Sequence, residues 1–239
     1  IYRYDLNTGA INGRFVVPGP STNAHDVNNY LRDDGTVSWA AIGRTSLGDI
    51  ALSESGDVLY VFNLENRTLY ALNANTGAPL ASAALPTANV PTPGDSTPTY
   101  AADDVRPFAV RFYQGKLYAG LVCSAESTQR LTDLWAHVYE VDPVTLAFSA
   151  NPIFQFALNY PRNMATNKPT QPADWNPWSP VFKTLPPNFT DAGGHAPVYP
   201  QPMLVGLDFD ADGNMILGLR DRFGDQVGNA AQSNPANDN

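Results

Sequence analysis

One short pattern occurs three times in this chain: a polar or aromatic approach, a glycine, one polar residue and then an apolar run. The copies are centred on Gly56, Gly115 and Gly213. A glycine between two such segments is typical of a tight turn that needs a positive φ, so each copy predicts a β-hairpin. This repeat constrains the fold more strongly than any other feature of the sequence.

A second unit alternates with the hairpins. It begins with a tyrosine, ends in a run of Asn, Asp, Thr or Gly, and occupies residues 2–9, 70–77 and 139–145. The pattern predicts an outer strand that ends in an Asx-type turn. Hairpin followed by outer strands, repeated along a chain, is the signature of β-propeller blades. The sequence therefore predicts an all-β fold, a β-propeller with irregular four-stranded blades.

Residues 1–228 are expected to form the blades, and residues 229–239 a polar tail. The chain starts in mid-blade, and its most complete blade is predicted near 48–54, 57–63, 67–73 and 79–85. A second blade runs from Arg106 to about Ile153, and a third hairpin opens at Met203. A long Pro- and Trp-rich insert, 154–201, has little strand periodicity and is expected to pack in order across one face.

This map contains two full blades and two half blades. Propellers ordinarily have four or more blades, which predicts a partial propeller or a fragment of a longer one. The alternative is a small ring in which the two ends join into one shared blade. Unpaired strand edges at both ends would also suit a subunit packed against other chains.

Composition restricts the partners. The net charge of −9 repels nucleic acid and anionic membrane surfaces. No apolar stretch approaches the ~20 residues that span a bilayer. Cys123 is the single cysteine, so a small buried thiol is expected and an internal disulfide is excluded. Few lysines and abundant Asn, Thr, Gly and Pro favour an extracellular location.

Several segments together resemble a known family. They are 106–126, 159–162, 175–178, 199–204 and 207–226, within a similar region of about 47–228. This set resembles a propeller-like region of large exported bacterial surface proteins that often carry SdrD B-like repeats, within the lactonase- and quinoprotein-like propellers. The resemblance implies a bacterial surface or secreted protein used for adhesion, recognition or assembly.

Propeller geometry predicts a charged face. If the three turn glycines lie on one face, the opposite ends of the hairpin strands gather near the central axis, where propellers usually hold ligands. The predicted ligand residues are Asp49, Arg106, Glu126, Asp221, Arg222 and Asp225, with Glu65 and Arg67 nearby. Arg222 and Asp225 flank Gly224, which permits close backbone approach. The alternative is a charged network that ties neighbouring blades together.

The third hairpin turn is similar to the first half of a calcium loop. Oxygen-bearing side chains stand at alternate positions, namely Asp208, Asp210, Asp212 and Asn214. The glutamate expected at position twelve is replaced by Leu219, and the first hairpin has serines instead of these aspartates. The segment is therefore a candidate calcium site with a metal-free turn as the alternative, and no other cofactor is predicted.

Trp175, Trp178 and Tyr199 are candidates for an aromatic platform on which sugar rings stack. The alternative is that these rings pin the long insert to the core.

Two functions remain open at this stage. The first is a non-catalytic extracellular binding or structural module with a protein or glycan partner. The second is a metal-dependent propeller hydrolase or lyase of the lactonase kind, which needs several carboxylates around one calcium. No nucleophile elbow, P-loop or zinc-binding histidine spacing stands in the chain.

Overall fold

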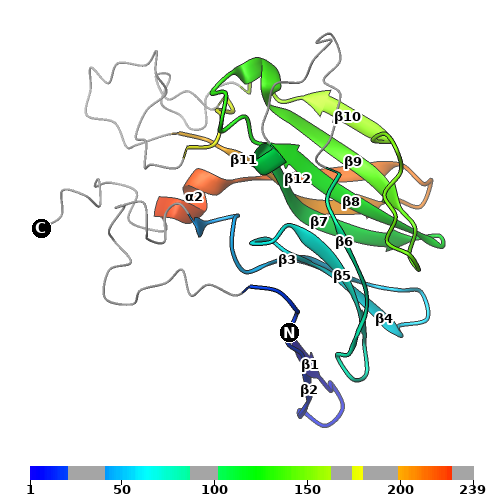
Figure 1. Cartoon of the computed structure of the whole chain (residues 1–239). Coiled ribbons are helices and arrows are strands. Elements are labelled where there is room, and N and C mark those ends of the chain that lie inside the picture. The colour runs from blue at the N-terminus through cyan, green and yellow to red at the C-terminus, as the bar shows by residue number, and fades with distance from the viewer. Residues whose placement is uncertain (21–40, 87–101, 163–173, 180–198, 228–239) are drawn as a thin grey trace, which may run out of the picture.

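The computed structural model describes residues 1–20, 41–86, 102–162, 174–179 and 199–227. Their strands form four antiparallel sheets (Figure 1). The first two sheets contain β1 (Tyr2–Tyr4) and β2 (Ile11–Arg14), then β3 (Leu47–Leu52), β4 (Val58–Asn63), β5 (Thr68–Asn73) and β6 (Pro79–Ala84). The other two contain β7 (Val105–Tyr113), β8 (Lys116–Cys123), β9 (Trp135–Val141) and β10 (Phe154–Ala157), then β11 (Pro202–Phe209) and β12 (Met215–Asp221).

All three predicted hairpins are present, as β3–β4, β7–β8 and β11–β12. The turn glycines have the positive φ that the pattern predicts: 76° at Gly56, 78° at Gly115 and 83° at Gly213. The first strand of each hairpin also carries an irregularity in its register, between 47 and 50, 107 and 109, and 204 and 206. A β-bulge at the same place in each copy shows that the three hairpins are structurally equivalent.

The outer-strand unit also recurs. The side-chain oxygen of Asp5, Asn73 or Asp142 accepts hydrogen bonds from the backbone N–H groups two and three residues later. The fifth residue of each turn has a positive φ, and it is Gly9, Gly77 or Leu146. The predicted Asx-type turns are thus confirmed, and the third forms with a leucine where the others have glycine.

The sheets stack in chain order, and each gap between neighbours holds an apolar core. Side chains alternate along β4, so that Leu59 and Val61 pack with Phe15 and Val17, which follow β2, while Tyr60 and Phe62 face the β7–β10 sheet. Along β9, Tyr139 and Val141 face the preceding sheet while Ala136 and Val138 face β11–β12. A strand with both faces buried is expected in the middle of a stack.

The first strands of the hairpins bring neighbouring sheets closest together, β3 against β7 and β7 against β11. Two glycines permit this approach. A Cβ at Gly48 would lie 2.8 Å from the carbonyl oxygen of Phe108, and one at Gly120 would lie 2.8 Å from Cδ2 of Leu204. Successive four-stranded antiparallel sheets with their first strands adjacent resemble the blades of a partial propeller. The all-β fold is confirmed.

Two details differ from the sequence-based map. The fourth strand of the second full sheet, β10, comprises residues 154–157, which the map assigned to an insert without strand structure. Phe154–Ala157 pairs with the outer edge of β9, and a strand of four residues is too short to give a clear periodic signal in the sequence. A short helix, α2 (Arg222–Val227), follows β12. The polar tail and much of the insert lie outside the described residues.

Within the described ranges, no helix is long and apolar enough to span a membrane.

Candidate functional site

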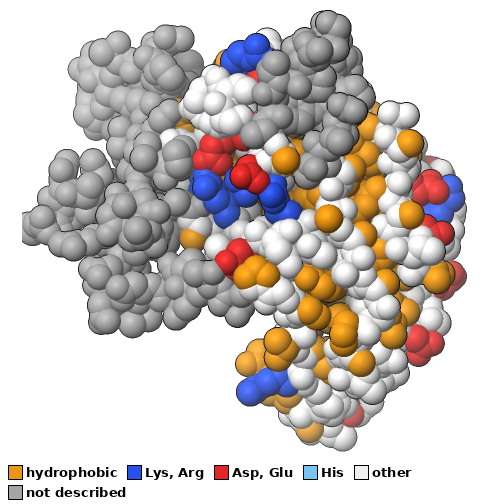
Figure 2. Space-filling view, viewed as in Figure 1, with side chains coloured by type: hydrophobic (Ala, Val, Ile, Leu, Met, Phe, Trp, Pro, Cys, Tyr) orange, Lys and Arg blue, Asp and Glu red, His pale blue; other side chains and the backbone are white. Residues whose placement is uncertain are grey.

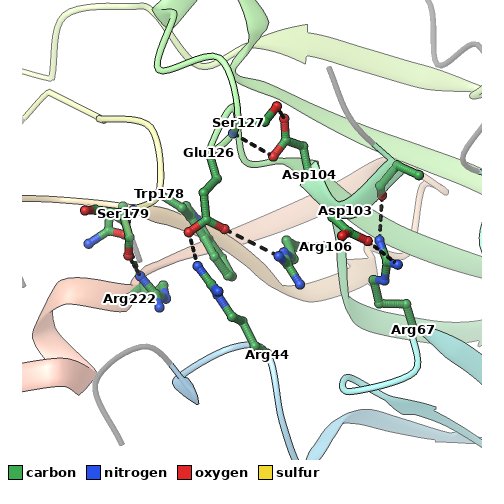
Figure 3. A network of polar contacts seen from close by, with 12 residues as sticks. Arg44, Arg67, Asp103, Asp104, Arg106, Glu126, Ser127, Trp178, Ser179 and Arg222 are labelled. Atoms are coloured by element: carbon green, nitrogen blue, oxygen red, sulfur yellow. Dashed lines mark hydrogen bonds and ion pairs between the residues drawn. The ribbon is translucent and has the colours of Figure 1, made fainter. Parts of the chain in front are cut away.

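The candidate site is a charged cluster where the hairpin strands begin and end, opposite the turn glycines. Arg106 comes from the start of β7, Glu126 from the segment after β8, and Arg44 from the turn before β3 (Figure 3). Glu126 accepts a hydrogen bond from Arg44 through Oε1, and its Oε2 lies 3.4 Å from Nη2 of Arg106. A single carboxylate therefore joins two arginines from neighbouring sheets.

Trp178 forms the aromatic centre of the cluster. The guanidinium carbon of Arg222 lies 4.5 Å from the centre of the indole, and that of Arg106 lies 5.8 Å away. Trp178 is only 1% exposed, and its Nε1 donates to the carbonyl of Pro202 at 2.8 Å. The backbone N–H of Trp178 also donates to the carbonyl of Ser124, and the two hydrogen bonds together hold the residue in place. Both arginines can then make cation–π contacts in a desolvated setting.

Arg222 joins segments that are far apart in the sequence. It is fully buried at the start of α2. Its Nε donates to the carbonyl of Ile42 at 2.7 Å, and its Nη1 donates to Oε1 of Gln201 at 2.6 Å and to the carbonyl of Ser179 at 3.2 Å. A planar guanidinium suits this role because it offers several donors in fixed directions. Arg222 thereby links the turn before β3, the 174–179 segment and the start of β11.

Positive charge exceeds negative charge at the centre of the cluster. Burial, followed by the nearby charges of Arg44 and Arg67, lowers the pKa of Arg106 to about 10. Burial also lowers the pKa of Arg44. Both remain protonated at neutral pH, so Glu126 is the group that balances them. Figure 2 shows this gathering of blue and red side chains on one face of the molecule.

Two further contacts border the cluster. Arg67 binds Asp103 at 2.6 Å and the carbonyl of Ala102 at 2.6 Å. Asp104 is 2% exposed and accepts hydrogen bonds from the backbone N–H and the hydroxyl of Ser127. Together they fix the short 3-10 helix at 102–104 where the chain begins β7.

The structure brings together three of the six predicted ligand residues, namely Arg106, Glu126 and Arg222. Asp49 lies farther along β3, with Oδ2 3.4 Å from the N–H of Val110. Asp221 accepts hydrogen bonds from the N–H groups of Gln201 and Phe223, and burial raises its pKa. Asp225 pairs with Arg220. These last three aspartates have other local partners. The six predicted ligand residues therefore do not form one group in the structure.

The aromatic platform prediction is corrected. Trp175, Trp178 and Tyr199 are 3%, 1% and 1% exposed, so these rings offer no open face for a sugar. The guanidinium of Arg162 covers Trp175, with its carbon 3.5 Å from the ring centre. The burial agrees with the alternative, in which the rings attach the insert to the core.

The calcium-loop prediction is also corrected. Asp208 pairs with Arg111 at 2.8 Å, whereas Asp210 accepts hydrogen bonds from Asp212 and Asn214 and closes the turn. These bonds lower the pKa of Asp210. The carboxylates therefore do not converge, and the described residues contain no group of three or more His, Cys, Asp or Glu that could hold a metal.

Sequence reasoning missed Arg44 and Gln201. Arg44 belongs to a connection without periodicity and lies 82 residues from Glu126, so no local pattern pairs them. The available signal was the presence of a basic residue just before the first strand of a hairpin in a chain with few charges. Gln201 precedes β11 and bridges Arg222 to the backbone N–H of Ser179.

The contacts of the described residues in the cluster can stabilise the packing of neighbouring sheets. Of the histidines, His25 and His195 lie outside the described residues. His137 is buried in β9, and burial lowers its pKa to about 4. Burial raises the pKa of the Cys123 thiol to about 12, so it is no nucleophile at neutral pH.

No protein-family model matches the chain. It is similar to colossin-A from Dictyostelium discoideum, with 29% identity over 188 residues, which are 77% of this chain and 2% of colossin-A. Colossin-C from the same organism is 29% identical over 189 residues, which are 77% of this chain and 16% of that protein. The chain thus corresponds to a small part of these much longer relatives.

Two solved structures share some of the arrangement. BamB from Moraxella catarrhalis matches 53% of this chain and 29% of its own, with 13% identity and a TM-score of 0.27. A europium-containing methanol dehydrogenase matches 67% and 21%, with 16% identity and a TM-score of 0.35. Both TM-scores are low, so the fold is assigned from the strand pairing and sheet packing of this chain.

Proposed function

We propose that this chain is a non-catalytic binding or structural module of a longer exported protein, acting in adhesion, recognition or assembly. The observation that carries the proposal is the engagement of the charged cluster. Arg222 contacts the ring of Trp178 and donates hydrogen bonds to Gln201 and to two backbone carbonyls. Glu126 forms ion pairs with two arginines. Residues used in this way hold sheets and loops together, which is the network alternative.

Sequence similarity supports the proposed setting of the module. The resemblance to large bacterial surface proteins with SdrD B-like repeats supports an extracellular or cell-surface location. The colossin matches, which occupy small parts of long proteins, support a role as one unit among many. The partner is then a protein or a glycan, or a further part of the parent protein.

A lactonase-like enzyme would need several carboxylates converging on one cation. The described residues favour no such site, since Asp208 and Asp210 are engaged with Arg111 and with the turn backbone.

Two measurements test the proposal. Calorimetric titration with calcium and incubation with a panel of lactones should show neither micromolar binding nor hydrolysis. Calcium binding accompanied by hydrolysis would replace the proposal with the enzyme.

The location is tested separately. Antibodies raised against the purified chain should label intact cells of its source or the culture medium. Labelling that requires permeabilised cells would contradict export.

A further inference from the structure

The stack ends in two half sheets of opposite kinds. The Asx-type turn places β1–β2 in the position of β5–β6, the outer half of a full sheet. The turn glycine and the bulge place β11–β12 in the position of β3–β4, the inner half. One edge of β1 and one edge of β12 pair with no described strand. Each half therefore lacks what the other supplies.

Residue exposure on β1 indicates a missing neighbour. Tyr2 and Tyr4 occupy the positions that Tyr70 and Leu72 occupy in β5, as the first and third residues of the repeated unit. Tyr70 and Leu72 pack with Phe15 and Val17 and are 9% and 0% exposed. Tyr2 and Tyr4 are 62% and 56% exposed. Large apolar side chains in register with buried ones indicate an interface.

The second strand of each hairpin presents a side chain to the first strand of the next sheet. The ring centre of Tyr60 in β4 lies 6.1 Å from that of Phe112 in β7, and the ring centre of Tyr118 in β8 lies 4.8 Å from that of Phe209 in β11. The equivalent residue of β12 is Ile216, and its contact is missing among the described residues.

The partner of Ile216 follows from register. Phe112 and Phe209 stand next to the hairpin turn, opposite Leu117 and Met215. Leu52 of β3 pairs with Leu59 of β4, and it is therefore the equivalent of Phe112 and Phe209 in the hairpin at the other end of the stack. Ile216 is 56% exposed and Leu52 is 54% exposed, as expected of two halves of a contact that the described residues of one chain do not make.

A groove of about 660 Å³ lies where an inner hairpin would fit. It is lined by the N-terminal residues through Arg3, by Ile50, Leu52 and Leu59 of β3–β4, and by Phe112. Arg3 gives the groove positive charge, and Asp210 and Asp212 give the turn of the β11–β12 hairpin negative charge. Arg111, also in the lining, is already paired with Asp208 of its own chain. Shape, apolar lining and charge all suit a hairpin of this kind.

We propose that a second copy of this chain inserts its β11–β12 hairpin into this groove and pairs its β12 with β1. Within one chain the two half sheets lie at opposite ends of the stack, with both four-stranded sheets between them (Figure 1). The existing pairs Leu59 with Leu72 and Leu117 with Val141 set the register. They place Met215 opposite Tyr4 and Leu217 opposite Tyr2, all on one face of the completed sheet.

Two copies joined head to tail complete a closed ring. The described residues of each copy hold two full sheets and two half sheets. The described sheets of two such copies would make up six blades, within the ordinary range of propellers. The inference deepens the assembly role proposed above by naming the partner.

Light scattering after gel filtration of the full chain should give twice the mass of one chain at micromolar concentration. Ile216→Arg should weaken the dimer at least ~10-fold without unfolding the monomer, because its side chain is exposed and the groove is positively charged. Val144→Arg is the matched control, since Val144 is 79% exposed in the Asp142 turn and should leave the dimer intact.

A mixture of Ile216→Cys chains and Leu52→Cys chains should form a disulfide-linked pair on mild oxidation. Ile216→Cys mixed with Val144→Cys should not. A monomeric wild-type chain, or equal cross-linking in both mixtures, would overturn the inference. Calcium binding accompanied by lactone hydrolysis, or an intracellular location, would instead overturn the proposed function, so the two failures can be told apart.

Discussion

Replacing Glu126 with glutamine tests whether the charged cluster is a structural network. The substitution keeps the shape of the side chain but removes the carboxylate that pairs with Arg44 and Arg106. Arg44, Arg106 and Arg222 would then place unbalanced positive charge around Trp178 in a mostly dehydrated site. Breaking a buried ion pair costs ~3–5 kcal/mol, and breaking an exposed one costs ~0–1 kcal/mol.

The side chains of Glu126 and Arg106 are each 12% exposed, and that of Arg44 is 23% exposed. This burial places the cost nearer the upper case, at about 2–4 kcal/mol. For a domain of this length each kilocalorie lowers Tm by ~2–4 °C, which predicts a loss of roughly 4–16 °C. Urea unfolding followed by circular dichroism measures the change in the free energy of unfolding, and a thermal melt measures the loss in Tm.

Glu140→Gln serves as the matched control. Glu140 binds Lys116 at 2.8 Å, but their side chains are 37% and 53% exposed, so stability should hardly change. Arg44→Met combined with Glu126→Gln should be less destabilising than the sum of the single changes, with a coupling of about 1–3 kcal/mol. Strict additivity, or a Glu126→Gln variant as stable as the wild type, would refute the network.

Three further substitutions test packing and titration. Gly48→Ala should destabilise the fold by ~1–3 kcal/mol, because the added Cβ would meet the carbonyl oxygen of Phe108. Gly224→Ala is the control, because a Cβ there would enter open space, and this variant should be neutral or stabilising. Thermal melts of both variants measure the difference. Burial lowers the pKa of His137 to about 4, so the unfolded chain takes up its proton first as pH falls below 6.5. Stability should decline by about 2 kcal/mol between pH 7 and pH 5, and His137→Leu should remove that decline in urea unfolding at the two pH values. An unchanged pH dependence in His137→Leu would contradict this assignment.

The hairpins and Asx turns were predictable because their causes are local. A positive φ at Gly56 and the hydrogen bonds of Asp5 depend on residues within one turn. The limit of such reasoning appears at Leu146, which adopts a φ of 59° without being glycine. Leu146 is fully buried in the core between the two full sheets, and its packing there offsets the backbone cost.

The charged cluster was only half predictable. Strand ends indicated that Arg106, Glu126 and Arg222 would approach one another. The partners depended on segments far away in the chain, since Arg222 binds a carbonyl 180 residues earlier. Burial of Trp178 and the pairing of Asp208 with Arg111 likewise depend on how sheets meet, which no spacing in the sequence records.

From the sequence alone came the strands, their turns and the alternation of faces, because these follow from φ preferences and a period of two residues. Only the tertiary structure decided which faces are covered. Tyr70 and Tyr2 hold the same place in the same repeated unit, yet Tyr70 is buried in a cluster with Phe15 and Val17 and none of the described strands covers Tyr2. Burial depends on what lies across the gap, and that is a property of the packed sheets.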